Sequence, residues 1–594
     1  MNTMTNKIRA IILLSATAVL QYAASADGDF YKYTNHYPDR PEYSPTPELF
    51  KTPPPSARPQ TWWHWVNGNV TREGIDADLK EMADKGYGAA IIFSLGGGKE
   101  GQIKFNSPEW FEIFSYAVSK AKEYGIELGI HNCDGWSECG GPWVGVEDSM
   151  KAMTWVLKRF DGGEIEIEQP PSKYNFYRDI AVIAYPARRP AKPEAAGKLA
   201  KITPANDNSS VGPESEIPAM FDANRDTIFK ISAKKRGLGY GAVLEFSEPF
   251  RAGSIYVEAK MAYRFPPDII IETSNDGKNF EKAGELKFGM SPVGSAKFKE
   301  RSAKYWRLSR DDKGSNAEPN MGIIEMELIP DGSVPANASQ IPQHAVKAAL
   351  IEHSRTDIPP TGKFDVKKES IVKLSEVKVM ATPKPDANGS IKISLPAGKW
   401  EVARLGYTTT GIRVHPCTKY GAGLEIDKMS SRAADMHFDS YIKKMVEASG
   451  SEKGKTFRYV ETDSWECKQQ TWTEGFEKMF EDTTGYDILK WSPVFFGACV
   501  EGAESSDNFL SDFRRAVSGA IMKNFFGRLG ERIRSESMSY ELEPVTNTAI
   551  CDPLNNFRLA DIPQHEQWNP MRDPNAVARD GAGYVGFNGV GDEA

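Results

Sequence analysis

Near its N-terminal end the sequence alternates between strand and helix patterns, and this alternation constrains the fold more than any other feature. Three short apolar runs, Gln60–Trp65, Ala89–Phe93 and Ile126–His131, have the length and composition of strands buried in a parallel sheet. The two segments between them, Thr71–Lys85 and Trp110–Tyr124, repeat apolar residues at helical spacing. Strands that alternate with helices in this way predict a parallel α/β sheet.

The pattern changes to short alternating strands and turns from about Phe160 to Ala381. Val243–Phe246 and Ser254–Val257 are typical strands, and Asn275-Asp276-Gly277 is a strong hairpin-turn signal. We therefore expect an inserted all-β module, a sandwich that resembles discoidin-like or galactose-binding-like domains.

After this module the α/β alternation resumes. Further strands are predicted at Trp400–Gly406, Arg458–Thr462, Met538–Glu541 and Ala560–Glu566, and helices at His437–Ala448 and Phe509–Arg534. Seven barrel-like strands predict a (β/α)8-type TIM barrel that the β-sandwich module interrupts. The Gly-rich tail Gly581–Ala594 contains no strand–helix pair, so we expect the barrel to be truncated at its end. The expected domains are a signal peptide over 1–26, the first part of the barrel over 27–155, the inserted module over 156–385, and the second part of the barrel over 386–594.

The N-terminus has the layout of a secretory signal peptide. Lys7 and Arg9 precede an apolar run, Ala10–Leu20, and small residues at Ala23–Ala26 form a cleavage site before Asp27. The apolar run is too short to anchor a mature protein in a membrane. We expect an exported protein, periplasmic or extracellular, with no transmembrane segment in the mature chain.

Length, net charge and cysteine content limit the number of domains, the classes of binding partner and the disulfides that we expect. A chain of 594 residues is too long for one hydrophobic core. Its net charge of -8 argues against nucleic acid as a partner, because nucleic-acid binding needs a basic surface. Of the six cysteines, Cys133 and Cys139 are spaced closely enough for a local disulfide, although buried free thiols are an equally good interpretation.

Polar and aromatic residues gather where the predicted barrel strands end, which is where such barrels keep their active sites. Carboxylates and amides bind sugar hydroxyls and aromatic rings stack on sugar C–H faces, so this composition suits a carbohydrate substrate. The residues that we expect to contact the substrate are His64, Trp65, Asn67, His131, Asp134, Trp136, Asp463, Trp465, Glu541 and Trp568.

Cleavage of a glycosidic bond needs two carboxyl groups with different protonation states. One gives a proton to the leaving oxygen, and the other activates water or attacks the sugar carbon. The candidates at the strand ends are Glu461, Asp463, Glu466, Glu541, Glu543 and Glu566. For any single one of them a solvated or salt-bridged role is the alternative.

Several long, Trp-rich motifs resemble glycoside hydrolase family 106. They extend over about Arg58 to Asp573, nearly the whole mature chain. The matching segments are Trp62–Asn69, Ile75–Leu79, Asp134–Trp143, Leu405–Gly411, Gly423–Met429, Asp463–Glu466, Trp472-Thr473, Gly485–Asp487, Tyr540-Glu541 and Ala560–Trp568.

The resemblance implies an α-L-rhamnosidase that acts with inversion and depends on calcium. Carried over onto this sequence, Glu466 is similar to the family's general acid and Glu566 to its general base. Glu461 and Glu541 are the candidate metal ligands, because calcium prefers carboxylate oxygens. Two alternatives stay open: a glycosidase of other sugar specificity on the same scaffold, or an inactive, truncated carbohydrate-binding protein.

Overall fold

The protein contains a six-stranded parallel sheet with the order β1-β2-β3-β21-β23-β24. The computed structural model describes residues 46–54, 57–190, 192–222, 227–235, 237–260, 268–288, 293–310, 320–336, 366–544 and 552–565. The strands are β1 (Gln60–Val66), β2 (Ala89–Leu95), β3 (Glu127–Asp134), β21 (Phe457–Thr462), β23 (Ser539–Leu542) and β24 (Ile562–Pro563). The strand–helix alternation predicted from the sequence is thus confirmed.

Helices connect successive strands of this sheet and begin and end where the local sequence dictates. After α2 (Pro47–Lys51), α3 (Arg72–Asp84) begins at Thr71, whose side chain accepts a hydrogen bond from Gly74 N. α4 (Pro108–Tyr124) begins at Ser107 and ends at Gly125, which has a left-handed φ of 70°. Before β21 lie α6 (Ser431–His437) and α7 (Lys443–Ala448), joined by a π-helical turn.

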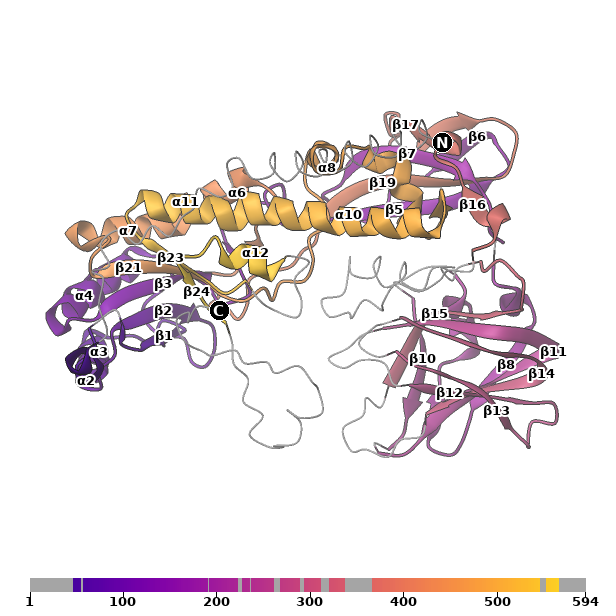
Figure 1. Ribbon diagram of the computed structural model, residues 1–594, viewed down its shortest axis with the longest axis horizontal. Helices are drawn as coiled ribbons and strands as arrows, with labels where there is room; N and C mark the ends of the chain where they lie inside the picture. Colours follow the sequence, from indigo (N-terminus) through magenta and orange to yellow (C-terminus); the bar gives the residue numbers. More distant parts are fainter. Residues whose placement is uncertain are drawn as a thin grey trace, which may run out of the picture.

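The longest helical segment precedes β23. It consists of α10 (Ala503–Ile521), a π-helical turn over Met522–Gly527, and α11 (Arg528–Ser535). Shorter helices are α8 (Phe476–Thr484), α9 (Ile488–Trp491) and, before β24, α12 (Pro553–Phe557). Figure 1 shows α10 and α11 as one long rod that extends beside both the parallel sheet and the antiparallel strands β5, β7 and β19.

The predicted TIM barrel is confirmed only in its parallel α/β arrangement. Within the described residues β1 and β24 are the two edges of the sheet, and no pairing closes it. The strand predicted at Trp400–Gly406 exists as β19 (Trp400–Thr409), but its assignment to the barrel is wrong. It pairs antiparallel with β5 (Lys151–Phe160) and β7 (Arg178–Pro186), whereas a barrel strand would pair parallel with its neighbours.

β19 belongs to a four-stranded antiparallel sheet, β17-β7-β19-β5, which packs into the same hydrophobic core as the parallel sheet. The fourth strand of this sheet is β17 (Lys378–Met380). An antiparallel pair of strands, β6 (Gly163–Ile167) and β18 (Ile391–Leu395), covers the other face of the sheet. Short two-residue pairs complete this region: β4 (Gly140–Gly141) with β20 (Leu424–Glu425), and β16 (Ile371–Val372) with β22 (Cys499–Val500).

The predicted β module forms an antiparallel β-sandwich with a core of its own. Its strands are β8 (Leu199–Pro204), β9 (Ser209–Val211), β10 (Phe229–Ala233), β11 (Tyr240–Ala259), β12 (Ile269–Ser274), β13 (Glu281–Leu286), β14 (Val293–Arg310) and β15 (Asn320–Ile329). The Asn275-Asp276-Gly277 turn joins β12 to β13 as the sequence predicts. Figure 1 shows this sandwich set apart from the parallel sheet.

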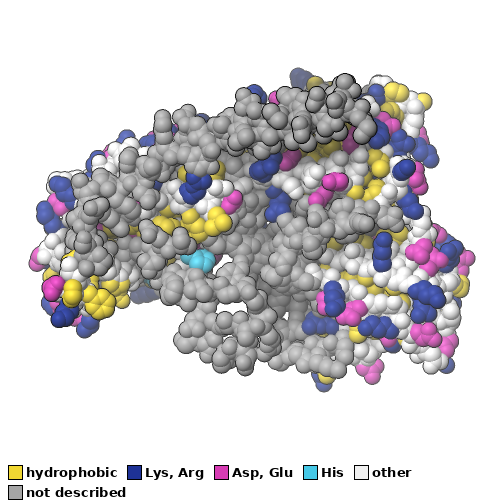
Figure 2. Space-filling model, viewed as in Figure 1, with side chains coloured by type: hydrophobic (Ala, Val, Ile, Leu, Met, Phe, Trp, Pro, Cys, Tyr) yellow, Lys and Arg dark blue, Asp and Glu magenta, His cyan; other side chains and the backbone are white. Residues whose placement is uncertain are grey.

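Four of the sequence predictions concern charge, membrane spans, cysteines and export. On the face drawn in Figure 2, basic and acidic side chains are interspersed over the described part of the chain, with no large patch of one sign. None of the described helices is long and apolar enough to cross a membrane. Cys133 and Cys139 are both buried free thiols, so the local disulfide is not formed. The predicted signal peptide lies outside the described residues.

Candidate active site

Side chains of the parallel sheet alternate between two faces, and this alternation decides which residues form the site. On β1, Trp63 and Trp65 point into the core beneath the helices, whereas Trp62, His64 and Val66 are exposed on the opposite face, which we call the inner face. The inner face of the neighbouring strands carries a small apolar cluster that includes Ala89, Ile91, Phe93, Leu95, Tyr459 and Ile562.

One row of inner-face residues crosses the whole sheet near its carboxyl edge. His64 pairs with Phe93, Glu461 with both His131 and Glu541, and Glu541 with Ile562. The Phe93 ring joins the two halves of the row, because it stacks on His131 at a centroid distance of 4.8 Å. The predicted residues His64, His131, Glu461 and Glu541 are therefore brought to one level of one surface, although up to 477 positions separate them in the chain (541 minus 64).

Glu461 is the most unusual member of the row. Its side chain is fully buried, and neither carboxylate oxygen makes a hydrogen bond of normal geometry within the described residues. Burial, followed by the nearby carboxylates of Asp463, Glu541 and Glu543, raises the pKa of Glu461 well above its ordinary value. The Trp62 side chain acts in the opposite direction as a nearby hydrogen-bond donor.

Glu541 lies beside Glu461 and is also fully buried. One of its oxygens accepts a hydrogen bond of 3.2 Å from Gln564 Nε2, while the other has no partner in the described part of the chain. Burial raises the pKa of Glu541 to about 8, and the Gln60 side chain acts against this shift as a donor. The structure thus places two buried, incompletely bonded carboxyl groups side by side.

The approach of Gln60 to Glu541 also shows that the sheet curls. Gln60 lies on β1 and Glu541 on β23, with three strands between them. In a flat sheet the two strands would be roughly 19 Å apart, since neighbouring strands are about 4.8 Å apart. The curl makes the inner face concave.

His131 is held as a neutral ring in the middle of the row. It is 1% exposed, and burial lowers its pKa to about 4. Nδ1 lies 3.2 Å from the carbonyl oxygen of Cys133, and Nε2 accepts the backbone N–H of Asp463 at 3.4 Å. His131 therefore fixes the start of the Asp463–Glu466 loop through its hydrogen bonds.

Glu466, the predicted general acid, is exposed on the loop that follows β21. Its backbone N–H donates to the carbonyl oxygen of Ser137 at 3.1 Å, and Ser464 Oγ lies 3.4 Å from Oε1. The loop is thereby attached to the segment after β3, so that Glu466 projects at the carboxyl edge of the sheet.

A buried ionic network behind this loop holds it in place. Lys428 Nζ is 2.7 Å from Glu425 Oε2, and both side chains are fully buried. Glu425 also accepts hydrogen bonds from Ser137 Oγ at 2.6 Å and Cys139 N at 3.0 Å. A second buried pair, Lys151 with Asp427, lies 2.6 Å apart.

Glu138 adjoins the first of these pairs and was not among the predicted site residues. It is fully buried, has a φ of 152°, and neither carboxylate oxygen has a hydrogen-bond partner among the described residues. Burial raises its pKa well above the ordinary value, against the opposing charge of Lys428. Glu138 lies shortly after the end of β3, and this position could have marked it as a candidate site residue. The sequence alone could not show that its side chain points inward.

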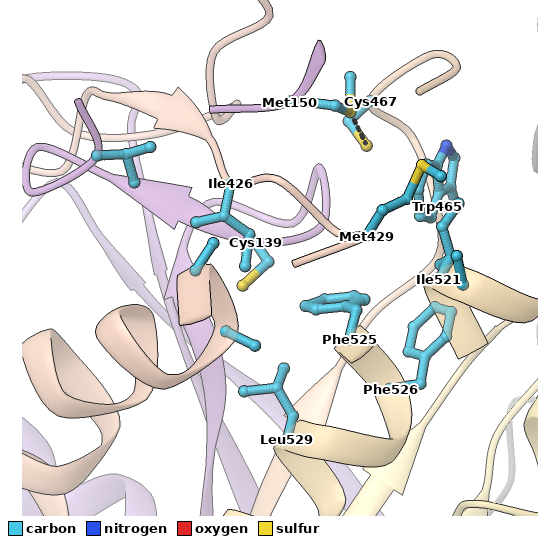
Figure 3. Packing of buried hydrophobic residues seen from close by; sticks show 14 of the residues in the cluster. Cys139, Met150, Ile426, Met429, Trp465, Cys467, Ile521, Phe525, Phe526 and Leu529 are labelled. Carbon is cyan, nitrogen blue, oxygen red and sulfur yellow. Dashed lines mark hydrogen bonds between the residues drawn. The ribbon is translucent and has the colours of Figure 1, made fainter. Parts of the chain in front are cut away.

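Two predicted substrate contacts are wrong for a physical reason. Trp65 is 2% exposed and packs edge-on against Trp110 at 5.2 Å, on the helix-covered face of the sheet. Trp465 is 0% exposed and lies among Met429, Phe525 and Phe526, as Figure 3 shows. Side chains without accessible surface cannot stack on a sugar, so both tryptophans support the site from behind.

The other predicted contacts lie near the carboxyl edge in different roles. Asn67, with a φ of 51°, donates its backbone N–H to Leu95 O at 2.6 Å and shapes the loop after β1. Asp134 is buried, and its Oδ2 accepts hydrogen bonds from the backbone N–H and the hydroxyl of Thr418, so it fixes a neighbouring loop. Trp136 is half-buried against the inner-face cluster, and Asp463 is 6% exposed.

Glu566 and Trp568 lie outside the described residues, so the predicted base and one predicted contact remain predictions. Conversely, the structure adds Trp62, which is 38% exposed on the inner face beside Glu461. The alternation of β1 was the signal that could have selected Trp62 over Trp65, because neighbouring residues of a strand point to opposite faces.

Calcium stays a prediction, and only the donor chemistry of two residues fits it. The buried carboxylates of Glu461 and Glu541 are hard oxygen donors, and neither forms an ion pair with a Lys or Arg of the described residues. Among those same residues, no three or more His, Cys, Asp or Glu side chains are arranged to hold a metal ion. Glu461 and Glu541 would therefore supply only part of a calcium shell.

Comparison with known proteins gives two extended similarities. The chain is 26% identical over 569 residues to a "putative beta-glucuronidase" of Formosa agariphila, a match that covers 93% of this chain and 36% of that protein. The solved rhamnosidase of Novosphingobium sp. PP1Y is 26% identical with a TM-score of 0.69, and the match covers 89% of this chain and 50% of that one. The chain thus spans about a third to a half of the length of these relatives.

The family assignment rests on a match over most of the chain. The family model described as alpha-L-rhamnosidase matches residues 51–584, which include the parallel sheet and its inner-face carboxylates. The chain belongs to glycoside hydrolase family 106.

Proposed function

We propose that this protein is an exported, inverting α-L-rhamnosidase that removes terminal rhamnosyl groups from complex polysaccharides. The observation that carries the proposal is the position of Glu466. It is an exposed carboxyl group of a family 106 chain, at the same edge of the sheet as the buried carboxylate row.

In the proposed reaction Glu466 donates a proton to the glycosidic oxygen as the bond to the sugar breaks. Glu566 removes a proton from a water molecule that attacks the opposite side of the sugar carbon, which inverts its configuration. Such a pair needs roughly 6.5–9.5 Å between its carboxyl groups, to leave room for the water. The backbone hydrogen bond from Glu466 N to Ser137 O supports this role, because it holds the loop that presents the acid.

Glu461 and Glu541 are proposed to hold calcium, which would orient the sugar by binding its hydroxyl groups. Their buried, incompletely bonded oxygens support this role. Thermal melting with and without Ca²⁺ tests it separately from activity: the wild type should be stabilised by Ca²⁺, and an E461Q/E541Q variant should not. Equal stabilisation of both proteins would contradict the assignment.

A β-glucuronidase activity is the second candidate, favoured by the name of the Formosa agariphila relative. The family model described as alpha-L-rhamnosidase and the similarity to the Novosphingobium sp. PP1Y rhamnosidase favour rhamnose instead.

A panel of nitrophenyl glycosides decides between the candidates. We expect release from the α-L-rhamnoside, weak or no release from the β-D-glucuronide, and proton NMR should show the inverted anomer as the first product. Preferential cleavage of the glucuronide would reverse the choice. Glycan binding with no turnover on any member would support a non-catalytic carbohydrate-binding protein.

A further inference from the structure

Trp62 presents an exposed aromatic surface on the inner face. Its side chain is 38% exposed, whereas Phe93 and His131 are 1% exposed and Tyr459 is 5% exposed. Trp62 is held at an angle by two ring contacts, with Phe93 at 5.3 Å and His64 at 6.3 Å. Its outer face is therefore open and held in one orientation, which is the arrangement an aromatic ring needs to stack on a ligand.

The surroundings of Trp62 define what kind of ligand would fit. Its indole is near enough to Glu461 to act as a hydrogen-bond donor to that carboxylate, and Glu541 lies beside Glu461 on the next strand. An aromatic face therefore adjoins two acceptor groups that lack full hydrogen bonding. A pyranose matches this arrangement, because one face of its ring consists of C–H groups while its edge carries hydroxyls.

Trp62 differs from the other two tryptophans of β1, which pack in the hydrophobic core. Trp63 donates Nε1–H to Asp78 at 3.0 Å and packs edge-on against Trp65 at 5.4 Å, both beneath the helices. Trp62 does not belong to that core cluster, so its side chain is not needed to fill the interior.

We propose that Trp62 is the sugar-stacking residue of this site. Its exposed indole face packs against the C–H face of the sugar ring, and the ring hydroxyls point toward Glu461 and Glu541, where the proposed calcium would bind them. This inference rests on the proposed carbohydrate function of the inner face but not on the identity of the sugar.

The test compares three variants of the full chain: Trp62→Phe keeps an aromatic face, Trp62→Leu keeps apolar bulk without a ring face, and Trp62→Ala removes both. Binding is measured by calorimetry with free L-rhamnose, L-fucose, D-galactose and D-glucuronate, and KM and kcat with the best nitrophenyl glycoside. Tyr174→Ala is the matched control, because Tyr174 is 55% exposed away from the sheet.

We expect Trp62→Ala and Trp62→Leu to weaken sugar binding and raise KM by about tenfold, as the loss of one stacked ring contact implies. Trp62→Phe should stay within about threefold of the wild type, since a smaller ring still stacks. Melting temperatures of all three, and all properties of Tyr174→Ala, should remain close to those of the wild type.

Three outcomes would overturn the inference. Trp62→Leu could bind sugar as the wild type does, which excludes stacking. Trp62→Phe could lose as much binding as Trp62→Leu, which assigns the effect to the indole N–H instead. A fall in melting temperature that accounts for the lost binding would assign Trp62 to packing. If the wild type binds and cleaves no sugar, the proposed function itself fails, and this result is distinct from the other three.

Discussion

The two faces of the parallel sheet solve opposite problems with residues that alternate along the same strands. The helix-covered face buries Trp63, Trp65 and Tyr540 in one continuous hydrophobic core. Thr462 Oγ1 accepts hydrogen bonds there from Asn132 Nδ2 at 2.8 Å and from Tyr540 OH at 3.2 Å, and the described groups left without a partner on this face are neutral ones such as Trp65 Nε1.

The inner face buries carboxyl groups without completing their hydrogen bonds. Both oxygens of Glu461 and one of Glu541 lack partners within the described residues. Burying such groups destabilises a fold by an appreciable amount, so we infer a functional role for them. On this view one face supplies stability and the other supplies chemistry, and the predictions below test this division and the machinery around it.

The largest effect is expected for Glu466→Gln. Loss of the proton donor should lower kcat on a substrate with a poor leaving group by about 10²–10⁴-fold, the usual contribution of general acid catalysis. The melting temperature should not change, because Glu466 is exposed. Steady-state kinetics and thermal melting check both statements, with the exposed Glu474→Gln as control. A near-normal rate would remove Glu466 from the mechanism.

Lys428→Met tests the ionic network behind the site. Removing one partner of a fully buried ion pair leaves Glu425 uncompensated and should cost about 3–5 kcal/mol of unfolding free energy. The control is Lys80→Met, which breaks an ion pair with Asp84 in which both side chains are more than half exposed. Urea denaturation gives both values; equal stability of the two variants would show that the network is not structural.

Trp63→Ala and Trp62→Ala place the same substitution on opposite faces of β1. Trp63→Ala should cost about 3–5 kcal/mol, as expected for a large aromatic side chain removed from a core. Trp62→Ala should cost far less, because its ring is 38% exposed. Comparable losses in chemical denaturation would contradict the assignment of the two faces.

Glu541→Gln tests the inner face through pH and is expected to have the smallest effect. The pKa of Glu541 is raised from 4.5 to about 8, so the folded protein binds the proton more tightly than the unfolded chain. The stability from this proton is fully present below pH 4.5 and is lost as pH rises through about 8. Gln cannot ionise, so in the presence of a chelator the variant should lose less stability between pH 5 and pH 9 than the wild type. Identical pH dependence of the two melting temperatures would show that Glu541 is not protonated in the fold.

Much of the architecture could be predicted from local patterns. The apolar runs and caps around α3 and α4 gave the right elements, because hydrophobic periodicity and capping act over a few residues. The strand at Trp400–Thr409 was found but placed in the wrong sheet. A strand pattern does not specify its partners, which here come from β5 and β7, more than 200 residues earlier.

Local sequence was enough to predict the residue types at the carboxyl edge: carboxylates, histidines and tryptophans at the ends of successive strands. Which of them face the same surface depends on how distant strands pair and pack. Strand register and the curl of the sheet bring His64, Glu461 and Glu541 into one row. The same packing turns Trp65 and Trp465 inward, because burial in a core formed by distant helices outweighs their nearness to the site in sequence.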